Sequence, residues 1–348
     1  MRTAVAAFDV GGTHTRLRGG RTEDPAPVEA KVRTADHPSL EELLIACLRR
    51  ADLRPTHMVL AVAGRVPAHG TVRLTNLPAW PPFDSAGFAE RHGVRLRVVN
   101  DMTATAHGMA DLGPDEVRPL TRHDALTRHE PAAGGGELLA VSVGSGVGSA
   151  LLDAHGVVHT SESGHVTWQP ENDFEAGYLA GLRAEFDGAV TVEESIGGLR
   201  GFDRMYDYVR RGTPPGPGLD ERVTGARRAG AAVAPVITSA ALAGDACGIE
   251  VIRLFAALFG QYLRGVALVC LPAGGVVTLT SGVLQAPGVA ELLRTETEFL
   301  HRFISPGACH HDLLAEIPVR LALDPLVGVR GAYRMAVRDA GTEPGPTA

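Results

Sequence analysis

The residues of this sequence best suited to chemistry lie in short glycine-rich segments at the ends of apolar runs. Asp9-Val10-Gly11-Gly12-Thr13 ends the first such run. Two glycines between extended segments let backbone N–H groups approach an anion closely, and the Thr13 hydroxyl adds a donor. A carboxylate such as Asp9 is unfavourable at the end of a buried strand unless it faces a cation or its water shell. The segment therefore suits a phosphate with a metal ion, although an ordinary glycine hairpin has the same pattern.

Two later segments have the composition to hold the rest of a nucleotide. Gly144-Ser145-Gly146 lies between apolar segments about 135 residues after the first turn. At Ser281-Gly282 an apolar segment meets the next predicted helix through small residues, which would admit a flat ring such as adenine. Each segment alone is also compatible with a plain tight turn. Asn100 and Asp101, two further polar residues, end another apolar run between the two glycine turns.

The elements that must position these residues follow from the apolar spacing. Strands are predicted at 3–10, 14–18, 28–34, 58–63, 95–99, 137–143, 149–153, 276–280 and 317–323. Helices are predicted at 40–48, 85–92, 102–112, 249–271, 289–303 and 326–338. The first helix has a capping box, Ser39 with Glu42. Residues 121–136 and 211–234 are predicted to be loops. The arrangement strand, glycine turn, strand occurs twice, which suggests two lobes of related topology.

The composition excludes several classes of function. The net charge is −7, from 33 basic and 40 acidic residues. The basic residues are scattered, and nucleic-acid binding needs a basic stripe, so we expect no nucleic-acid partner. Lys31 is the one lysine. P-loop NTPases, protein kinases, Schiff-base enzymes and pyridoxal-phosphate enzymes need a lysine later in the chain and are therefore excluded.

The cysteines and the apolar segments indicate where the protein works. The four cysteines are widely spaced without a CxxC pair, and the N-terminus lacks a signal-peptide pattern, so we expect a reducing cytoplasm. Residues 265–290 carry no charge, but prolines, glycines and threonines interrupt them. We expect a buried helix end, a turn and a strand there, and no membrane span.

Taken together and in this order, the segments resemble the bacterial glucokinases of the hexokinase, Hsp70 and actin-like ATPase superfamily over nearly the whole chain. The matching segments are DVGGTHTR (9–16), LTN (74–76) followed by Trp80, VND-TA (99–104), VGSGVG (143–148), SESGHV (161–166) and 190–198 with Glu193. His14 and Thr15 replace the Asn-Ala expected after the first turn. Ser163 stands where the sugar-binding loop usually has glycine, and Ser281 replaces the first glycine of the adenosine turn.

The resemblance implies ATP-dependent phosphorylation of D-glucose at its 6-hydroxyl, the entry to glycolysis. Asp101 would be the general base, accepting the hydroxyl proton as that oxygen attacks the γ-phosphorus in line. The other sugar hydroxyls would bind Asn76, Asn100, Glu162, His165 and Glu193. ATP would contact Phe8, Asp9, Val10, Gly11, Gly12, Thr13, Gly144, Ser145, Gly146, Ser281 and Gly282. Mg²⁺ would accompany ATP, held indirectly through Asp9.

The fold implied is α/β, a two-lobed actin-like ATPase (ribonuclease H-like) fold with a mixed five-stranded sheet in each lobe and a cleft between them. We expect residues 1–107 and 325–340 in the small lobe, 108–324 in the large lobe, and 341–348 as a flexible tail. Sugar binding would close the cleft and exclude water. The family also implies a homodimer. The alternatives are a kinase for another hexose or amino sugar, ADP or polyphosphate as the phosphoryl donor, and a non-catalytic sugar-sensing protein.

Overall fold

The computed structural model describes residues 4–22, 26–67, 70–121, 136–144, 146–197, 200–286, 288–295 and 297–341. The chain forms two compact units. The first comprises Met1–Leu112, Val158–Thr160 and Leu326–Ala348, and the second comprises Gly113–Val157 and Ser161–Pro325. Because the last helix returns to the first unit, that unit is built from both ends of the chain.

The first unit is built on a five-stranded sheet with the strand order β3-β2-β1-β4-β7. Its strands are β1 (Ala4–Val10), β2 (His14–Arg21), β3 (Val28–Arg33), β4 (His57–Val62) and β7 (Arg95–Asn100). β1 pairs antiparallel with β2 and parallel with β4. A separate two-stranded sheet contains β5 (Thr71–Val72) and β6 (Phe83–Asp84). The first glycine turn therefore lies at the end of the central strand.

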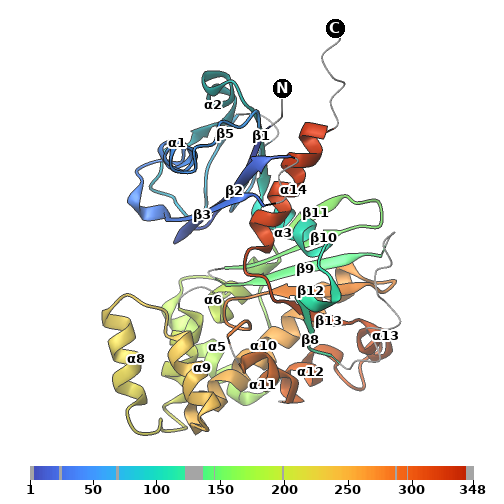
Figure 1. The fold of residues 1–348 in the computed structure, drawn as a ribbon. Helices are drawn as coiled ribbons and strands as arrows, with labels where there is room; N and C mark the ends of the chain where they lie inside the picture. Colours follow the sequence, from blue (N-terminus) through green and yellow to red (C-terminus); the bar gives the residue numbers. More distant parts are fainter. Residues whose placement is uncertain are drawn as a thin grey trace. The chain divides into compact units, whose positions relative to one another are not determined.

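The helices of the first unit are α1 (Leu40–Arg50), α2 (Ser85–His92), α3 (Asp101–Met109) and α14 (Val327–Gly341), with a 3₁₀ turn η1 (Thr34–Asp36). α1 begins where the capping box predicts, since Ser39 Oγ accepts from the N–H of Glu42 at 3.3 Å. α14 packs along α3 and β1 (Figure 1). A Cβ on Gly331 of α14 would lie 1.9 Å from the carbonyl oxygen of Ala104, so the close approach of these helices requires glycine.

The second unit is built on a six-stranded sheet with the order β11-β10-β9-β12-β13-β8. Its strands are β8 (Val117–Pro119), β9 (Leu138–Val143), β10 (Val147–Leu152), β11 (Val158–Ser161), β12 (Val276–Thr280) and β13 (Val319–Ala322). β9 pairs antiparallel with β10 and parallel with β12. The order β10-β9-β12 therefore repeats β2-β1-β4 of the first unit, and a glycine turn joins the antiparallel pair in each. This confirms the related topology predicted from the two turns.

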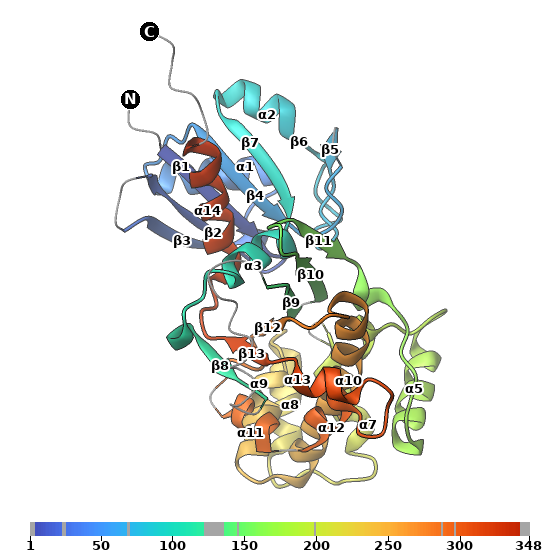
Figure 2. The same ribbon diagram turned by 90° about the vertical axis from the view of Figure 1, so that its right-hand side faces the viewer.

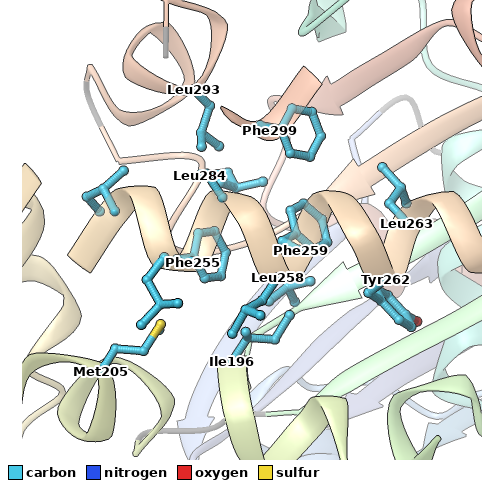
Figure 3. Packing of buried hydrophobic residues seen from close by; sticks show 14 of the residues in the cluster. Ile196, Met205, Phe255, Leu258, Phe259, Tyr262, Leu263, Leu284, Leu293 and Phe299 are labelled. Atoms are coloured by element: carbon cyan, nitrogen blue, oxygen red, sulfur yellow. The ribbon is translucent and has the colours of Figure 1, made fainter. Parts of the chain in front are cut away.

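The helices of the second unit gather on one side of its sheet (Figures 1 and 2). They are α5 (Asp173–Glu185), α6 (Val192–Ile196), α7 (Gly201–Val209), α8 (Leu219–Arg228), α9 (Ala234–Leu242), α10 (Ala246–Cys270), α11 (Val289–Thr295), α12 (Thr297–Ile304) and α13 (His311–Glu316), with 3₁₀ turns η2 (Pro114–Glu116) and η3 (Ser163–His165). α10 is the centre of this layer, and its apolar side chains pack against Ile196, Met205 and Phe299 (Figure 3).

α10 contains the first part of the uncharged segment, residues 265–270. In the described part of the chain it is the one helix long and apolar enough to cross a membrane, but 72% of its most apolar stretch is buried inside the unit. Phe255 and Phe259 are fully buried in the core. The apolarity of α10 is therefore explained by packing on most of its sides.

The structure corrects two expectations about elements. The second sheet has six strands where five were expected, because β8 adds an antiparallel edge strand beside β13. Residues 211–234 contain α8, with Leu219 and Val223 buried, so this segment is not simply an exposed loop. The helix expected at 289–303 is described as α11 and α12, and residue 296 between them lies outside the described residues. Residues 122–135, most of the expected loop, and 342–348, nearly all of the expected tail, lie outside the described residues.

Candidate active site

The first glycine turn joins β1 to β2 and is held by hydrogen bonds on both sides. Gly11 donates its N–H to the carbonyl of His14 at 3.1 Å, and its own carbonyl accepts from Thr34 Oγ1 at 2.7 Å. A Cβ on Gly11 would lie 2.8 Å from the His14 carbonyl oxygen, so this position requires glycine. Asn76 lies against the same turn, because its carbonyl oxygen is 3.6 Å from where a Cβ on Gly12 would stand. A predicted sugar contact and the predicted phosphate turn are thus neighbours.

Asp9 is the side chain of this strand end that is suited to a cation. Phe8 and Val10, on either side, bury their side chains in the apolar core, so a nucleotide could reach their backbone alone. Asp9 points to the opposite face of the strand. Its Oδ2 lies 3.3 Å from Arg16 Nη1, yet burial raises the pKa of the Asp9 carboxyl despite this neighbouring guanidinium. α14 begins beside it, since a Cβ on Gly328 would be 3.4 Å from the same oxygen.

Asn100 and Asp101 lie where β7 runs into α3. Asn100 caps the helix, because its Oδ1 accepts from Met102 N–H at 2.9 Å while its Nδ2 donates to the carbonyl of Gly64 at 3.1 Å. Asp101 is the first helical residue, and its Oδ1 accepts from the same N–H at 2.8 Å. The positive end of the helix dipole stabilises a carboxylate there. A half-buried carboxylate held in this way has the chemistry of a general base.

The second glycine turn joins β9 to β10 and contacts Glu193. The N–H of Gly144 donates to the carbonyl of Gly146 at 2.9 Å. Glu193 Oε2 accepts from the N–H of Val147 at 2.9 Å, and a Cβ on Gly146 would lie 2.8 Å from that same oxygen. Ser145 lies outside the described residues. A second predicted sugar contact is therefore adjacent to the second predicted phosphate turn.

Glu193 is held by the short helix α6. The helix begins with a capping box, in which Thr191 Oγ1 accepts from Glu194 N–H and the Glu194 carboxylate accepts from Thr191 N–H. The predicted sugar-binding loop, residues 161–166, is joined to the same helix, because the N–H of Val192 donates to the carbonyl of Val166 at 3.0 Å. The loop and α6 are thus one connected piece of structure.

Glu162 and His165 lie in this sugar-binding loop, at η3. Glu162 Oε2 is 3.7 Å from His165 Nε2, and the side chains are 71% and 56% exposed. A carboxylate beside an imidazole offers the acceptors and donors that neighbouring sugar hydroxyls need. The loop is seated on β10, because a Cβ on Gly164 would lie 2.0 Å from the carbonyl oxygen of Val147.

Ser281 and Gly282 follow β12, and they differ in environment. Ser281 is buried, and its Oγ accepts from the N–H of Leu284 at 3.2 Å, so its side chain serves the turn. Gly282 is exposed and lines a cavity of about 210 Å³ together with Gly144. The structure therefore brings the third predicted nucleotide segment to the second glycine turn.

Sequence patterning did not identify the other walls of this cavity or the hydroxyl groups behind the sugar-binding loop. Phe202 on α7 and Pro235 on α9 line the cavity, but they look like core and helix-start residues. Ser149 and Tyr262, which bond to one another through Ser163, have no spacing that marks them. Ser163 itself carried a signal, since it replaces a glycine in the pattern that the chain resembles.

Comparison with known proteins gives concordant results. A family model described as Glucokinase matches residues 6–339. The glucokinase of Caulobacter vibrioides (strain NA1000 / CB15N) is 30% identical over 333 residues, which are 93% of this chain and 92% of that protein. Of the solved structures, the glucokinase from Balamuthia mandrillaris in complex with glucose has a TM-score of 0.74 at 19% identity, covering 96% of this chain and 94% of that one. A ROK family glucokinase from Streptomyces griseus in complex with glucose and AMPPNP has a TM-score of 0.65 at 18% identity, with 96% and 99% covered.

The two sheets of matching topology, each with its glycine turn, and the likeness to these structures define the class: a mixed α/β protein with the actin-like ATPase fold. The family match over 6–339 and the 30% identity to a glucokinase narrow the class further. The chain belongs to the glucokinase family.

Proposed function

We propose that this protein is a glucokinase that transfers the γ-phosphoryl group of ATP to the 6-hydroxyl of D-glucose. The observation that carries the proposal is the hydrogen bond from Val147 N–H to Glu193, because it sets a predicted sugar contact against a predicted phosphate turn. The position of Asn76 beside Gly12 supports it in the same way. Neighbouring sites for acceptor and donor suit direct transfer between two bound substrates.

Asp101 is the proposed general base. Its carboxylate accepts the proton of the 6-hydroxyl as the oxygen attacks the γ-phosphorus, and ADP leaves on the opposite side. The anchoring of Asp101 Oδ1 by Met102 N–H supports this role, because it restricts the orientation of the carboxylate. The transfer needs no covalent enzyme intermediate, since positioning and electrostatic stabilisation supply most of its acceleration.

The remaining hydroxyls of glucose are proposed to bind Asn76, Asn100, Glu162, His165 and Glu193. Each sugar hydroxyl both donates and accepts, and carboxylates, amides and an imidazole satisfy that requirement. Of these, Glu162 and His165 are the most accessible, while Glu193 keeps one oxygen on Val147 N–H and has the other for a hydroxyl. A set of groups matched to hydroxyls in this way would bind sugars that lack a hydroxyl less well.

ATP is proposed to bind through Phe8, Asp9, Val10, Gly11, Gly12, Thr13, Gly144, Ser145, Gly146, Ser281 and Gly282. Phe8 and Val10 would contribute backbone groups and Ser281 the shape of its turn. The cavity between Gly144 and Gly282 supports an adenosine site, since its Phe202 and Pro235 walls are apolar. With one lysine in the chain, at position 31, phosphate recognition would depend on backbone amides and hydroxyls.

Mg²⁺ is proposed to enter with the nucleotide and to contact Asp9 indirectly. Mg²⁺ prefers oxygen ligands and usually keeps several waters, so one nearby carboxylate suffices beside the phosphates. Asp9 fits, because burial disfavours its ionised form and a neighbouring cation would favour it. When bound, Mg²⁺ would offset the negative charge of the phosphates.

The larger organisation is proposed from the family resemblance. The lobes would be residues 1–107 with 325–340 and residues 108–324, and the enzyme would be a homodimer. A cytoplasmic enzyme at the entry to glycolysis is consistent with the four free thiols. Sedimentation of the purified protein would give twice the chain mass if the homodimer is correct.

The catalytic proposal is tested by a coupled assay with glucose and MgATP that compares the wild type with Asp101→Ala. General base catalysis contributes about 10²–10⁴-fold, so we expect a loss of kcat in that range with glucose binding retained. A variant within ~10-fold of the wild type would remove Asp101 from the role of base.

The choice of substrate is tested separately. A panel of hexoses and amino sugars, ranked by kcat/KM, should place glucose first. A higher rank for an amino sugar would make the protein a kinase for that sugar. Replacing ATP by ADP or polyphosphate tests the donor in the same assay. Sugar binding without turnover on any donor would favour a non-catalytic sugar sensor.

A further inference from the structure

Four hydroxyl groups form a hydrogen-bonded chain beside the sugar-binding loop. Ser149 on β10 is fully buried, and its Oγ lies 2.8 Å from the Oγ atoms of both Ser161 and Ser163. Ser163 also lies 2.7 Å from the hydroxyl of Tyr262 on α10. Figure 3 shows Tyr262 at one end of the α10 core with its oxygen directed away from Phe259. The chain of hydroxyls therefore connects the sheet, the loop and the central helix.

Two of these four hydroxyl groups belong to rigidly held residues. Ser149 is in the centre of β10, and Tyr262 is 5% exposed in the core. Burial raises the pKa of the Tyr262 hydroxyl, against the opposing effect of the serine hydroxyls, so the group keeps its proton. A buried hydroxyl without a partner is unfavourable, which ties Tyr262 to Ser163. Ser163 is thus fixed from two sides.

The positions of the two ionisable side chains of the loop, Glu162 and His165, depend on this support. Among the side chains described, Glu162 and His165 contact one another at 3.7 Å and otherwise extend into solvent. Their backbones are joined by the hydrogen bond from His165 N–H to the Glu162 carbonyl at 2.9 Å. Ser163 lies between them in the same turn. Its anchoring therefore sets where both side chains stand.

The two central residues of the loop differ in the space around them. Gly164 has no room for a side chain, because a Cβ would meet the Val147 carbonyl at 2.0 Å. Ser163 instead borders a cavity of about 760 Å³ and directs its hydroxyl to Tyr262. A side chain is therefore accommodated at 163, where the resembling pattern has glycine, and it gains a partner.

We propose that Ser163 and Tyr262 are positioning residues for the sugar. Their hydrogen bond holds η3 so that Glu162 and His165 meet the hydroxyls of glucose without reorganisation. This assignment rests on the proposed glucokinase function. It concerns substrate affinity and not the transfer step, because both residues act through Glu162 and His165, which are proposed to bind the sugar. Rigidity of this kind improves binding by lowering the entropy lost when the loop is ordered.

The test is steady-state kinetics on Ser163→Ala, Tyr262→Phe and the double variant. Tyr262→Phe should raise KM for glucose by about 3–10-fold, the worth of one hydrogen bond, with kcat and KM for MgATP within about 2-fold. Ser163→Ala should raise KM for glucose at least as much, because it removes the bond to Ser149 as well as the bond to Tyr262. The double variant should resemble Ser163→Ala, because that change already removes the bond that Tyr262→Phe removes. Ser163→Thr keeps the hydroxyl and has room for its methyl group beside the cavity, so it should stay within about 2-fold of the wild type.

Tyr208→Phe is the matched control. Its hydroxyl donates to the carbonyl of Phe174 at 2.7 Å, so this bond joins α7 to α5 and not to the loop. Melting temperatures of all variants would show whether each is folded. If Tyr262→Phe does not fold, the comparison of Ser163→Ala with Ser163→Thr remains as the test. Glucose KM values no higher than that of Tyr208→Phe, or a Ser163→Thr variant as impaired as Ser163→Ala, would overturn the assignment. A wild type that phosphorylates no hexose would overturn the proposed function and this assignment with it.

Discussion

Replacing Gly164 by alanine adds one methyl group at the tightest point of the sugar-binding loop. The new Cβ would lie 2.0 Å from the carbonyl oxygen of Val147, and Cβ atoms essentially never come within 3.0 Å of such a neighbour. The obstacle is backbone and not the end of a flexible side chain, so it cannot rotate away. The loop and β10 must therefore separate by about 1.0 Å.

The size of this displacement sets the expected loss of activity. Hydrogen bonds are formed at about 2.7–3.2 Å, so a 1 Å shift of Glu162 and His165 breaks most of what they make with a sugar. A misplacement of about 1 Å costs roughly 10²-fold, or about 2.7 kcal/mol in transition-state stabilisation. Overpacking should cost about 1–3 kcal/mol in stability, which leaves the protein folded.

The assay is kcat/KM for glucose in the coupled reaction, with circular dichroism melting as the control for folding. Gly181→Ala is the matched substitution, because it lies on α5 of the same unit with nothing within 4 Å of the added Cβ. We expect Gly181→Ala to keep full activity and to gain about 0.5–1 kcal/mol in stability. Gly164→Ala with kcat/KM within about 3-fold of Gly181→Ala would refute the argument that the loop needs this close contact.

Two further substitutions test the charged groups. Burial raises the pKa of the Asp9 carboxyl in the folded protein above 3.8, its value in the unfolded chain. Ionised Asp9 therefore destabilises the folded protein at pH values above the raised pKa, and this destabilisation is absent below pH 3.8. Asp9→Asn should therefore raise the melting temperature at pH 8 while lowering activity, and a gain that does not shrink toward pH 4 would contradict this. Arg302 is buried, and its guanidinium bonds the Glu175 carboxylate at 2.6 Å. Arg302→Met should therefore lower the free energy of unfolding by about 3–5 kcal/mol, or the melting temperature by roughly 6–20 °C. Arg253→Met, in an exposed pair, should change the free energy of unfolding by no more than about 0.5 kcal/mol. Burial would raise the pKa of Glu171, but hydrogen bonds from an amide and two guanidinium groups, Arg302 among them, outweigh burial and hold that pKa at about 2. The loss of stability caused by Arg302→Met should therefore become smaller as the pH falls from 4.5 toward 2.

Local patterns were sufficient to predict the central strands of both sheets and the helices α1, α2, α3, α10 and α14, but no helix was predicted at α5, α6, α7, α9 or α13. The capping box at Ser39 located α1, and the paired apolar runs around each glycine turn located β1, β2, β9 and β10. α8 was missed because Leu219 and Val223 are its two buried apolar residues in an otherwise charged segment. β8 was missed because three residues that include a proline have no strand periodicity.

The contacts that assemble the candidate site could not be predicted from patterns in one sequence. The bond from Val147 to Glu193 and the bond from Ser163 to Tyr262 join residues that are far apart in the chain. Nothing in local spacing pairs such residues, since the pairing follows from how helices pack on the sheet. The site residues were inferred from the family resemblance, and the contacts they make required the fold.

The central claim is transfer of a phosphoryl group to the 6-hydroxyl of glucose with Asp101 as base, and ³¹P NMR of the reaction mixture tests it most directly. Wild-type protein with glucose and MgATP should yield glucose 6-phosphate with one ADP for each sugar phosphate. Asp101→Asn, which keeps the shape of the side chain, should form the same product more slowly by about 10²-fold or more. ADP and free phosphate without a sugar phosphate, or an undiminished rate for Asp101→Asn, would contradict the account.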